Sequence, residues 1–246
     1  MHRRNAAMEQ PIVIRENIDH YMQELTQWLG ETESEPLEHM TDFFTARIDS
    51  YEAHMALWRD AYRYMASILP EDAKTVLDLG CGTGLEIDEI MAARPGISIT
   101  GIDLSEAMLE KLYQKHPSVQ TFCADYFTYD LGLSEYDVVL SFETLHHFKP
   151  EKKQGLFQKI YRALKPGGVY LEADYLACCE GEERLLMQTA DRKRKRDGIP
   201  DDVFVHFDTP LTAEREMSLM TAAGFHPVQL IRCIQGACFI RADKKA

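Results

Sequence analysis

Hydrophobic residues in the N-terminal part of the chain recur at the spacing of an α-helix. Residues 16–29 carry apolar side chains three or four positions apart, which predicts an amphipathic helix that ends at Gly30. The stretches 42–50 and 51–69 repeat this spacing, and Pro70 follows the second of them. The pattern therefore predicts a group of helices before any strand.

Beyond Lys74, short apolar runs alternate with amphipathic stretches. This alternation predicts βα units and hence a parallel, doubly wound sheet. The predicted strands cover residues 75–79, 98–103, 119–124, 136–142 and 169–173, and the predicted helices between them cover 85–93, 105–116 and 151–164.

The end of the chain follows another pattern. Residues 212–223 predict a helix that stops at Gly224. The apolar runs 225–234 and 237–242 are separated by two residues that include a glycine, which predicts an antiparallel hairpin. The fold class is therefore α/β, with a mostly parallel sheet, a terminal hairpin and an N-terminal helical cap.

These patterns divide the chain into three parts. We expect a flexible N-terminus at 1–15, a helical cap at 16–69, and a main domain at 70–246. The main domain carries a lid-like insertion at about 178–210.

A basic run, Arg192–Arg196, lies in a helical pattern inside that insertion. It is either a patch for RNA or an acidic substrate, or one part of a solvated lid helix. The second interpretation is favoured, because the charges point around the helix and acidic residues surround them.

The most informative stretch is Thr75–Gly84, T-V-L-D-L-G-C-G-T-G. A buried strand that turns sharply into a helix has this pattern, and its glycines let a ligand approach the backbone amides. Leu85 stands where a dinucleotide fingerprint needs its third glycine. Asp103 ends the next apolar run, where a carboxylate can accept both hydroxyl protons of a ribose.

V-L-D-L-G-C-G-T-G followed by G-I-D-L-S resembles the class I S-adenosylmethionine (SAM)-dependent methyltransferase family, over roughly residues 40–246. The resemblance implies a seven-stranded Rossmann-like sheet whose last strand lies antiparallel between strands five and six. It implies SAM as cofactor and S-adenosylhomocysteine as product. The alternative is an α/β domain that binds another nucleotide, or none.

The resemblance also implies which residues hold SAM. The glycine loop holds the methionine part, Asp103 the ribose, and the segment at Asp125 the adenine. Asp78 either contacts the methionine part or only fixes the loop, and Phe142 covers the sulfonium side. The full expected set is Asp78, Gly80, Cys81, Gly82, Gly84, Asp103, Leu104, Met108, Asp125, Tyr126 and Phe142.

Two histidines, His146 and His147, follow the fourth predicted strand, at the edge where open α/β sheets bind ligands. Imidazole titrates near neutral pH, so both are candidate general bases; structural histidines are the alternative. Glu143 lies close enough in sequence to join a metal site, but no spacing compels one, and we expect no metal. The residues expected to contact the acceptor are Arg47, Tyr51, Tyr175 and His206, with Asp174, Phe207 and Asp208 facing the same region.

Composition narrows the class of partner. The chain has 246 residues and a net charge of −13, which disfavours extended contact with nucleic acid. Its apolar runs are too short to span a membrane, and the N-terminus does not resemble a signal peptide. Six cysteines lack zinc-site spacing, so we expect reduced thiols in a cytoplasmic protein.

The sequence therefore predicts a cytoplasmic SAM-dependent methyltransferase that acts on a small molecule by in-line displacement, and it is compatible with a homodimer. One alternative is a tRNA-modification-related enzyme that converts SAM to carboxylated SAM, for which Arg47 or the run Arg192–Arg196 would fix the extra carboxylate. The other is a non-catalytic SAM-binding regulator.

Overall fold

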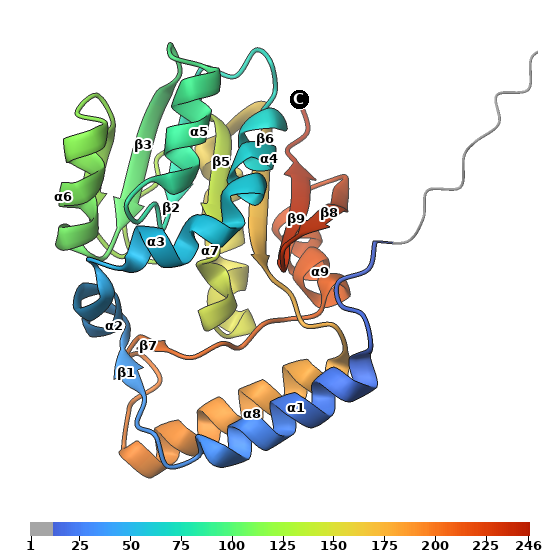
Figure 1. The fold of residues 1–246 in the computed structure, drawn as a ribbon. Helices are drawn as coiled ribbons and strands as arrows, with labels where there is room; N and C mark the ends of the chain where they lie inside the picture. Colours follow the sequence, from blue (N-terminus) through green and yellow to red (C-terminus); the bar gives the residue numbers. More distant parts are fainter. Residues whose placement is uncertain (1–11) are drawn as a thin grey trace, which may run out of the picture.

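The computed structural model describes residues 12–246 and is organised around one seven-stranded sheet (Figure 1). The strand order is β4-β3-β2-β5-β6-β9-β8. All neighbouring pairs from β4 to β6 are parallel, and β9 is antiparallel to both β6 and β8. The strands are β2 (Thr75–Leu79), β3 (Ser98–Asp103), β4 (Gln120–Cys123), β5 (Tyr136–Phe142), β6 (Leu164–Tyr175), β8 (Val228–Ile234) and β9 (Ala237–Asp243).

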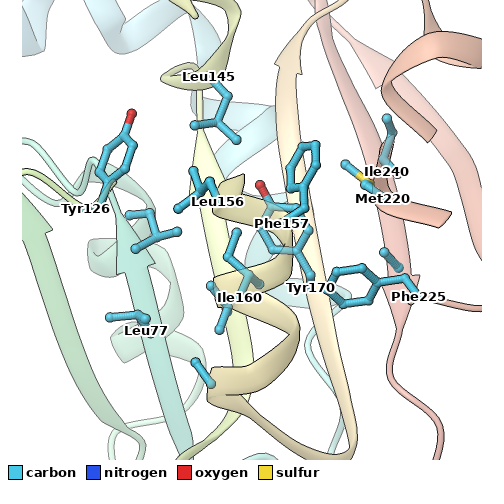
Figure 2. Close-up of a cluster of buried hydrophobic side chains, with 14 of the residues drawn as sticks. Leu77, Tyr126, Leu145, Leu156, Phe157, Ile160, Tyr170, Met220, Phe225 and Ile240 are labelled. Carbon is cyan, nitrogen blue, oxygen red and sulfur yellow. The ribbon is translucent and has the colours of Figure 1, made fainter. Parts of the chain in front are cut away.

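Helices cover both faces of this sheet because side chains of successive strand residues point to opposite faces. Leu77 in β2 belongs to one buried cluster, with side chains of α7 and α9, shown in Figure 2. Val76 belongs to the other cluster, with side chains of α4, α5 and α6. These helices are α4 (Arg59–Ser67), α5 (Leu85–Ala93), α6 (Glu106–Lys115), α7 (Pro150–Ala163) and α9 (Ala213–Ala223).

A smaller helical layer lies beyond the carboxyl ends of the parallel strands. Figure 1 shows α1 (Ile18–Glu31) and α8 (Glu180–Asp197) side by side there. The chain links them to the sheet through α2 (Met40–Arg47), α3 (Tyr51–Met55) and the 3₁₀ turn η1 (Ala56–Trp58). Strands β1 (Glu38–His39) and β7 (Val205–His206) pair antiparallel in this layer.

The predicted α/β architecture is confirmed, including the terminal hairpin with β9 between β6 and β8. Some boundaries differ. Helix α1 continues through Gly30 to Glu31, β6 is longer than predicted, and the two-residue strands β1 and β7 carried no recognisable pattern. Residues 1–11 of the predicted flexible terminus lie outside the described residues.

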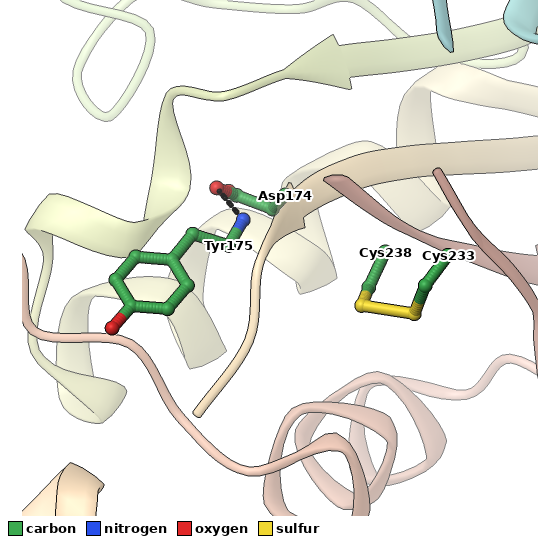
Figure 3. Close-up of a disulfide and its surroundings, with 4 residues drawn as sticks. All are labelled: Asp174, Tyr175, Cys233 and Cys238. Carbon is green, nitrogen blue, oxygen red and sulfur yellow. Dashed lines mark hydrogen bonds between the residues drawn. A yellow bond between two sulfur atoms is a disulfide. The ribbon is translucent and has the colours of Figure 1, made fainter. Parts of the chain in front are cut away.

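The expectation that all six cysteines are reduced thiols is wrong for two of them. Cys233 and Cys238 form a disulfide across the β8–β9 hairpin (Figure 3). The register of the hairpin places them directly opposite each other. A separation of five residues does not indicate a disulfide by itself, because the pairing depends on the register of the hairpin. Cys81, Cys123, Cys178 and Cys179 are free.

Candidate cofactor and acceptor site

The glycine loop between β2 and α5 is tied to the neighbouring strand. The backbone amides of Gly80 and Cys81 both donate to the carbonyl oxygen of Ile102, over 2.8 and 3.2 Å. Gly80 has a φ of 76°, and a Cβ built there would lie 2.5 Å from Oγ1 of Thr144. A side chain at this position is therefore strained, and the loop passes directly under the segment that follows β5.

Asp103, at the end of β3, joins this loop to the next helix. Its Oδ2 accepts from the amide of Gly82 over 2.9 Å, and its Oδ1 accepts from the amide of Ser105 over 2.8 Å. Ser105 in turn caps α6 through the amide of Met108. Burial raises the pKa of Asp103, against the lowering effect of these amides. Each carboxylate oxygen keeps a lone pair, so the group can still accept two hydroxyl protons.

A pocket opens over these groups. It lies at the carboxyl ends of β2 and β5, where successive strands stop adding to one side of the sheet and begin adding to the other. It collects six of the expected cofactor residues, together with Tyr51 and His147 from the other expected sets. Thr144 and Phe44 also line it. The sequence pattern did not predict either residue as a site residue, although both lie close in sequence to residues that it did predict. Its lining includes Gly80, Gly82, Asp103, Leu104, Met108, Tyr126, Tyr51, His147, Thr144 and Phe44.

The other expected cofactor residues lie elsewhere around the loop. Cys81, Gly84 and Phe142 line a separate recess, which shares Gly80 and Tyr51 with the pocket. Asp125 is not part of either lining, and its Oδ1 accepts from the amide of Phe127 over 2.8 Å.

Asp78 lies fully buried under the loop, and neither of its carboxylate oxygens has a hydrogen-bond partner among residues 12–246. Glu86, which lines the recess, is also buried. Burial and the nearby Glu86 carboxyl raise the pKa of Asp78 well above its usual range, and burial raises the pKa of Glu86 to about 7. A buried carboxyl without partners is rare in folded proteins, and Asp78 is in the lining of neither the pocket nor the recess.

His146 is buried, and a carboxylate fixes the orientation of its ring. Its Nδ1 is hydrogen-bonded to Oδ1 of Asp174, at the end of β6. Oδ2 of Asp174 accepts from the amides of Leu145 and His146 over 2.8 and 3.1 Å. Burial lowers the pKa of His146, but the Asp174 carboxylate outweighs it and brings the pKa to about 9.

His147, by contrast, lines the pocket. Its Nδ1 lies 3.3 Å from Oδ1 of Asp208, and burial together with the charge of His146 lowers its pKa. Asp208 is carried on the chain after β7, which is anchored where the amide of Thr209 donates to the carbonyl oxygen of His146 over 2.7 Å. The two expected histidines therefore have different surroundings.

A second cavity, of about 800 Å³, adjoins the pocket and shares Phe44 and Tyr51 with it. The wall from the N-terminal helices is largely aromatic, and two carboxyl groups face it. Of the expected acceptor residues, Arg47, Tyr51 and His206 line this cavity, with Phe43, Phe44, Met55, Trp58, Glu143 and Asp208.

Tyr175, the fourth expected acceptor residue, is not in that lining. It lies in the neighbouring cavity between α1 and α8, where its hydroxyl is 3.0 Å from that of Tyr21 and is hydrogen-bonded to Glu182. Arg47 is committed to Glu38, with two hydrogen bonds of 3.0 and 3.1 Å, and lies over the Phe43 ring.

Four of the five residues of the basic run in α8 contact the protein itself, whereas Lys195 is exposed. Arg192 pairs with Glu33, and Nζ of Lys193 donates to the carbonyl oxygen of Thr32 over 2.7 Å. Arg196 donates to the carbonyl oxygen of Glu35. These contacts tie α8 to the segment that follows α1.

Comparisons with known proteins agree with this site. Residues 76–168 match a family model described as a methyltransferase domain. The chain is 36% identical over 187 residues to carboxy-S-adenosyl-L-methionine synthase of Campylobacter concisus, covering 68% of this chain and 75% of that one. It is 27% identical over 230 residues to the enzyme of that name from a Nitratiruptor species, covering 87% and 93%.

Among solved structures, human N-acetylserotonin methyltransferase in complex with SAM matches with a TM-score of 0.64 at 21% identity, covering 92% of this chain and 66% of that one. In the described residues, no helix is long and apolar enough to cross a bilayer. The glycine loop, the acid at the end of β3, the strand order and these relatives together establish that the chain belongs to the class I SAM-dependent methyltransferase family, whose members are enzymes that use SAM.

Proposed function

We propose that this enzyme transfers the methyl group of SAM to a small-molecule acceptor held in the aromatic cavity beside the cofactor pocket. The observation that carries the proposal is that the two spaces lie on either side of Phe44 and Tyr51, which line both, with His147 on the cofactor side and Asp208 on the acceptor side. An acceptor in that cavity would lie next to the cofactor, with Phe44 and Tyr51 between the two spaces. Methyl transfer needs little more than this, because the sulfonium is already an activated donor.

The residues around the loop fit SAM. Asp103 has free lone pairs for the ribose hydroxyls, and Leu104, Met108 and Tyr126 offer apolar surface for the adenosine. The α-ammonium of the methionine part would supply the partner that Asp78 lacks. Asp125 and Phe142 stay proposed cofactor contacts at the adenine and sulfonium ends.

A carboxylated SAM product is the second candidate, because the relatives in Campylobacter concisus and Nitratiruptor are named carboxy-SAM synthases. That chemistry needs a cation for an extra carboxylate. In the described part of the chain, Arg47 is paired with Glu38 and the run Arg192–Arg196 is tied to the cap. The site therefore supports methyl transfer better than carboxy-SAM synthesis.

We further propose roles for the parts of the chain. The helices of 16–69 supply the aromatic wall of the acceptor cavity, residues 70–246 bind SAM, and the insertion at 178–210 closes the far side. We propose a cytoplasmic location, which the four free thiols support and the Cys233–Cys238 disulfide opposes; cell fractionation tests it. A homodimer is tested by light scattering on the purified chain.

The test begins with calorimetry, titrating SAM and S-adenosylhomocysteine into the purified protein. A screen with radiolabelled methyl-SAM over small hydroxyl, amine and carbon-acid acceptors follows, with tRNA as a separate arm. Label in a small molecule supports the proposal. Mass spectrometry of the nucleoside released from the protein identifies the second candidate if carboxylated SAM is found. Tight SAM binding without transfer in any arm supports a non-catalytic regulator and rejects the proposal.

A further inference from the structure

Three side chains from two distant segments converge where the cofactor pocket meets the acceptor cavity. His146, His147 and Asp208 each place one potential ligand atom within 4.8 Å of the others. Nε2 of His146 lies 3.5 Å, and Nδ1 of His147 3.3 Å, from the same oxygen, Oδ1 of Asp208. Ligand atoms that share one ion at 2.0–2.2 Å are themselves about 3–3.5 Å apart, so these separations suit a shared ion.

The ring of His146 has the orientation that a metal ligand needs, with one nitrogen fixed by a carboxylate and the other directed at the cluster. Nδ1 of His146 is hydrogen-bonded to Asp174, so its other nitrogen, Nε2, is directed at Asp208. Metal-binding histidines usually hold a carboxylate or carbonyl on their second nitrogen in this way. Asp174 is itself fixed by two backbone amides, those of Leu145 and His146.

The second imidazole has two oxygen neighbours, because Nδ1 of His147 lies 3.4 Å from the carbonyl oxygen of Phe207 and 3.3 Å from Oδ1 of Asp208. His147 turns its Nδ1 to the carboxylate oxygen that His146 already faces, and both distances are longer than a good hydrogen bond to a charged group. Both imidazoles therefore face one carboxylate oxygen, at separations that also suit ligand atoms around a shared ion. The segment with Asp208 is also anchored to His146 through Thr209, so the geometry is built into the fold.

We propose that His146, His147 and Asp208 bind one divalent first-row transition metal ion, of the zinc, iron or manganese class. Two imidazoles and one carboxylate form a donor set typical of such ions when coordination positions stay open for substrate. Because Asp208 lines the acceptor cavity and His147 the cofactor pocket, an acceptor oxygen bound to the ion would face the methyl donor. The local sequence offered only Glu143 beside the two histidines and predicted no metal site; Asp208, 61 residues beyond His147, joins them only in the folded chain.

The role in transfer rests on the proposed function, whereas metal binding itself does not. An acceptor hydroxyl bound to the ion would release its proton to water at a lower pH. Its oxygen would then form a bond to the methyl carbon while the carbon–sulfur bond breaks. The electron pair of that bond goes to sulfur, which leaves as a neutral thioether. His147 then activates the acceptor as a metal ligand, and a separate general base is unnecessary.

The experiment titrates Co²⁺ into the full-length chain after treatment with a chelator and follows the visible d–d absorption. We expect bands that saturate at one equivalent. Asp208→Asn keeps the size of a side chain that is 43% exposed, so the variant should fold, and we expect at least a tenfold weaker Co²⁺ affinity. His147→Ala should abolish the bands. His116→Ala is the matched control: His116 pairs with Asp88 over 2.6 Å outside this cluster, and its variant should bind Co²⁺ normally.

Absent bands, or equal Co²⁺ affinity in the wild type and Asp208→Asn, would overturn the metal site. The outcomes for the two proposals are separable. Methyl transfer that survives complete removal of metal keeps the proposed function and rejects the role of the ion. Saturable Co²⁺ bands in a protein that transfers no methyl group keep the metal site and reject the proposed function.

Discussion

Single residues decide whether the cofactor pocket can form, and Asp103 is the clearest case. Its two oxygens accept amides from two different segments, the glycine loop and the start of α6. The carboxylate therefore both shapes the pocket and lines it. A residue with both roles should affect ligand affinity more than a residue at the rim.

Asp103→Ala should weaken SAM binding by about 100-fold, because it removes charge-assisted hydrogen bonds to two ribose hydroxyls that together contribute about 3 kcal/mol. Calorimetry measures the change. Asp137→Asn, at the opposite edge of the sheet, serves as a control with unchanged affinity. An Asp103→Ala variant that binds as tightly as the wild type would refute the assignment of the ribose.

Gly80→Ala should cost about 1–3 kcal/mol of folding stability, since a side chain at a φ of 76° is strained and its Cβ meets Thr144 at 2.5 Å. SAM affinity should fall with it, because Thr144 lines the pocket. Gly96→Ala is a suitable comparison, as a Cβ there meets nothing within 4 Å. Urea unfolding of both variants checks the difference, and equal midpoints would contradict it.

Pairs of elements are held by polar contacts that sequence periodicity does not show. Lys153 on α7 and Glu216 on α9 are both buried, and their charged atoms lie 2.8 Å apart. Such a pair is costly to desolvate. Removing one member therefore lowers stability more than removing both, because it leaves the other charge buried without a partner. It fixes how the two helices lie on their face of the sheet.

Lys153→Met should lower the free energy of unfolding by about 3–5 kcal/mol, because Glu216 is left buried without its partner. The double variant Lys153→Met/Glu216→Leu should recover at least half of the loss. Urea unfolding monitored by circular dichroism measures both. A double variant less stable than the single one would show that the pair contributes favourable free energy of its own.

At the amino ends of β2 and β5, Asp137 accepts from Lys165 and from the amides of Lys74 and Thr75. Burial raises the pKa of Asp137, but these hydrogen bonds outweigh it and bring the pKa to about 2. A lowered carboxyl pKa contributes stability above the pKa of the unfolded chain, about 3.9, and that contribution is lost as the pH falls towards 2.

Asp137→Asn should therefore be about 1 kcal/mol less stable than the wild type at pH 7, a small value because the side chain is partly solvated. The difference should shrink as the pH is lowered from about 5, over the range in which both proteins stay folded. Parallel urea titrations at several pH values measure it. A difference that is constant with pH would contradict the assigned pKa.

At the scale of the whole molecule, the helical layer formed by α1 and α8 covers the carboxyl edge of the sheet (Figure 1). Lys193 is buried between them, and its ammonium donates to the carbonyl oxygens of Thr32 and Glu35 over 2.7 and 3.3 Å. The cavity between the two helices is lined partly by residues of the acceptor site, including Arg47 and His206. Opening this layer would therefore disturb acceptor binding before SAM binding.

Lys193→Met should increase hydrogen exchange in α1 and in residues 32–37, because two charge-assisted hydrogen bonds to backbone are lost. Exchange in β2 and β3 should not change, and SAM affinity should stay within twofold. Lys195→Met, at an exposed position of the same helix, is the control. If the protection of α1 from hydrogen exchange is unchanged, contacts other than those of Lys193 hold α1 against α8.

The sequence by itself determined the parallel βα units, the order in which they occur, and the cofactor loop with Asp103. Strand and helix periodicity, glycine conformation and the chemistry of a carboxylate after a strand are local properties, so a short window contains them. The resemblance to a known family supplied the strand order, which no local pattern carries.

Tertiary structure alone decided which distant groups meet. It separated His146, held by Asp174, from His147, which faces the pocket, and it placed Asp208 beside both. It also paired Cys233 with Cys238 and directed the basic run to the cap. These contacts depend on where loops and helices pack in three dimensions, and hydrophobic periodicity sets the face that an element buries but not the partner it meets there.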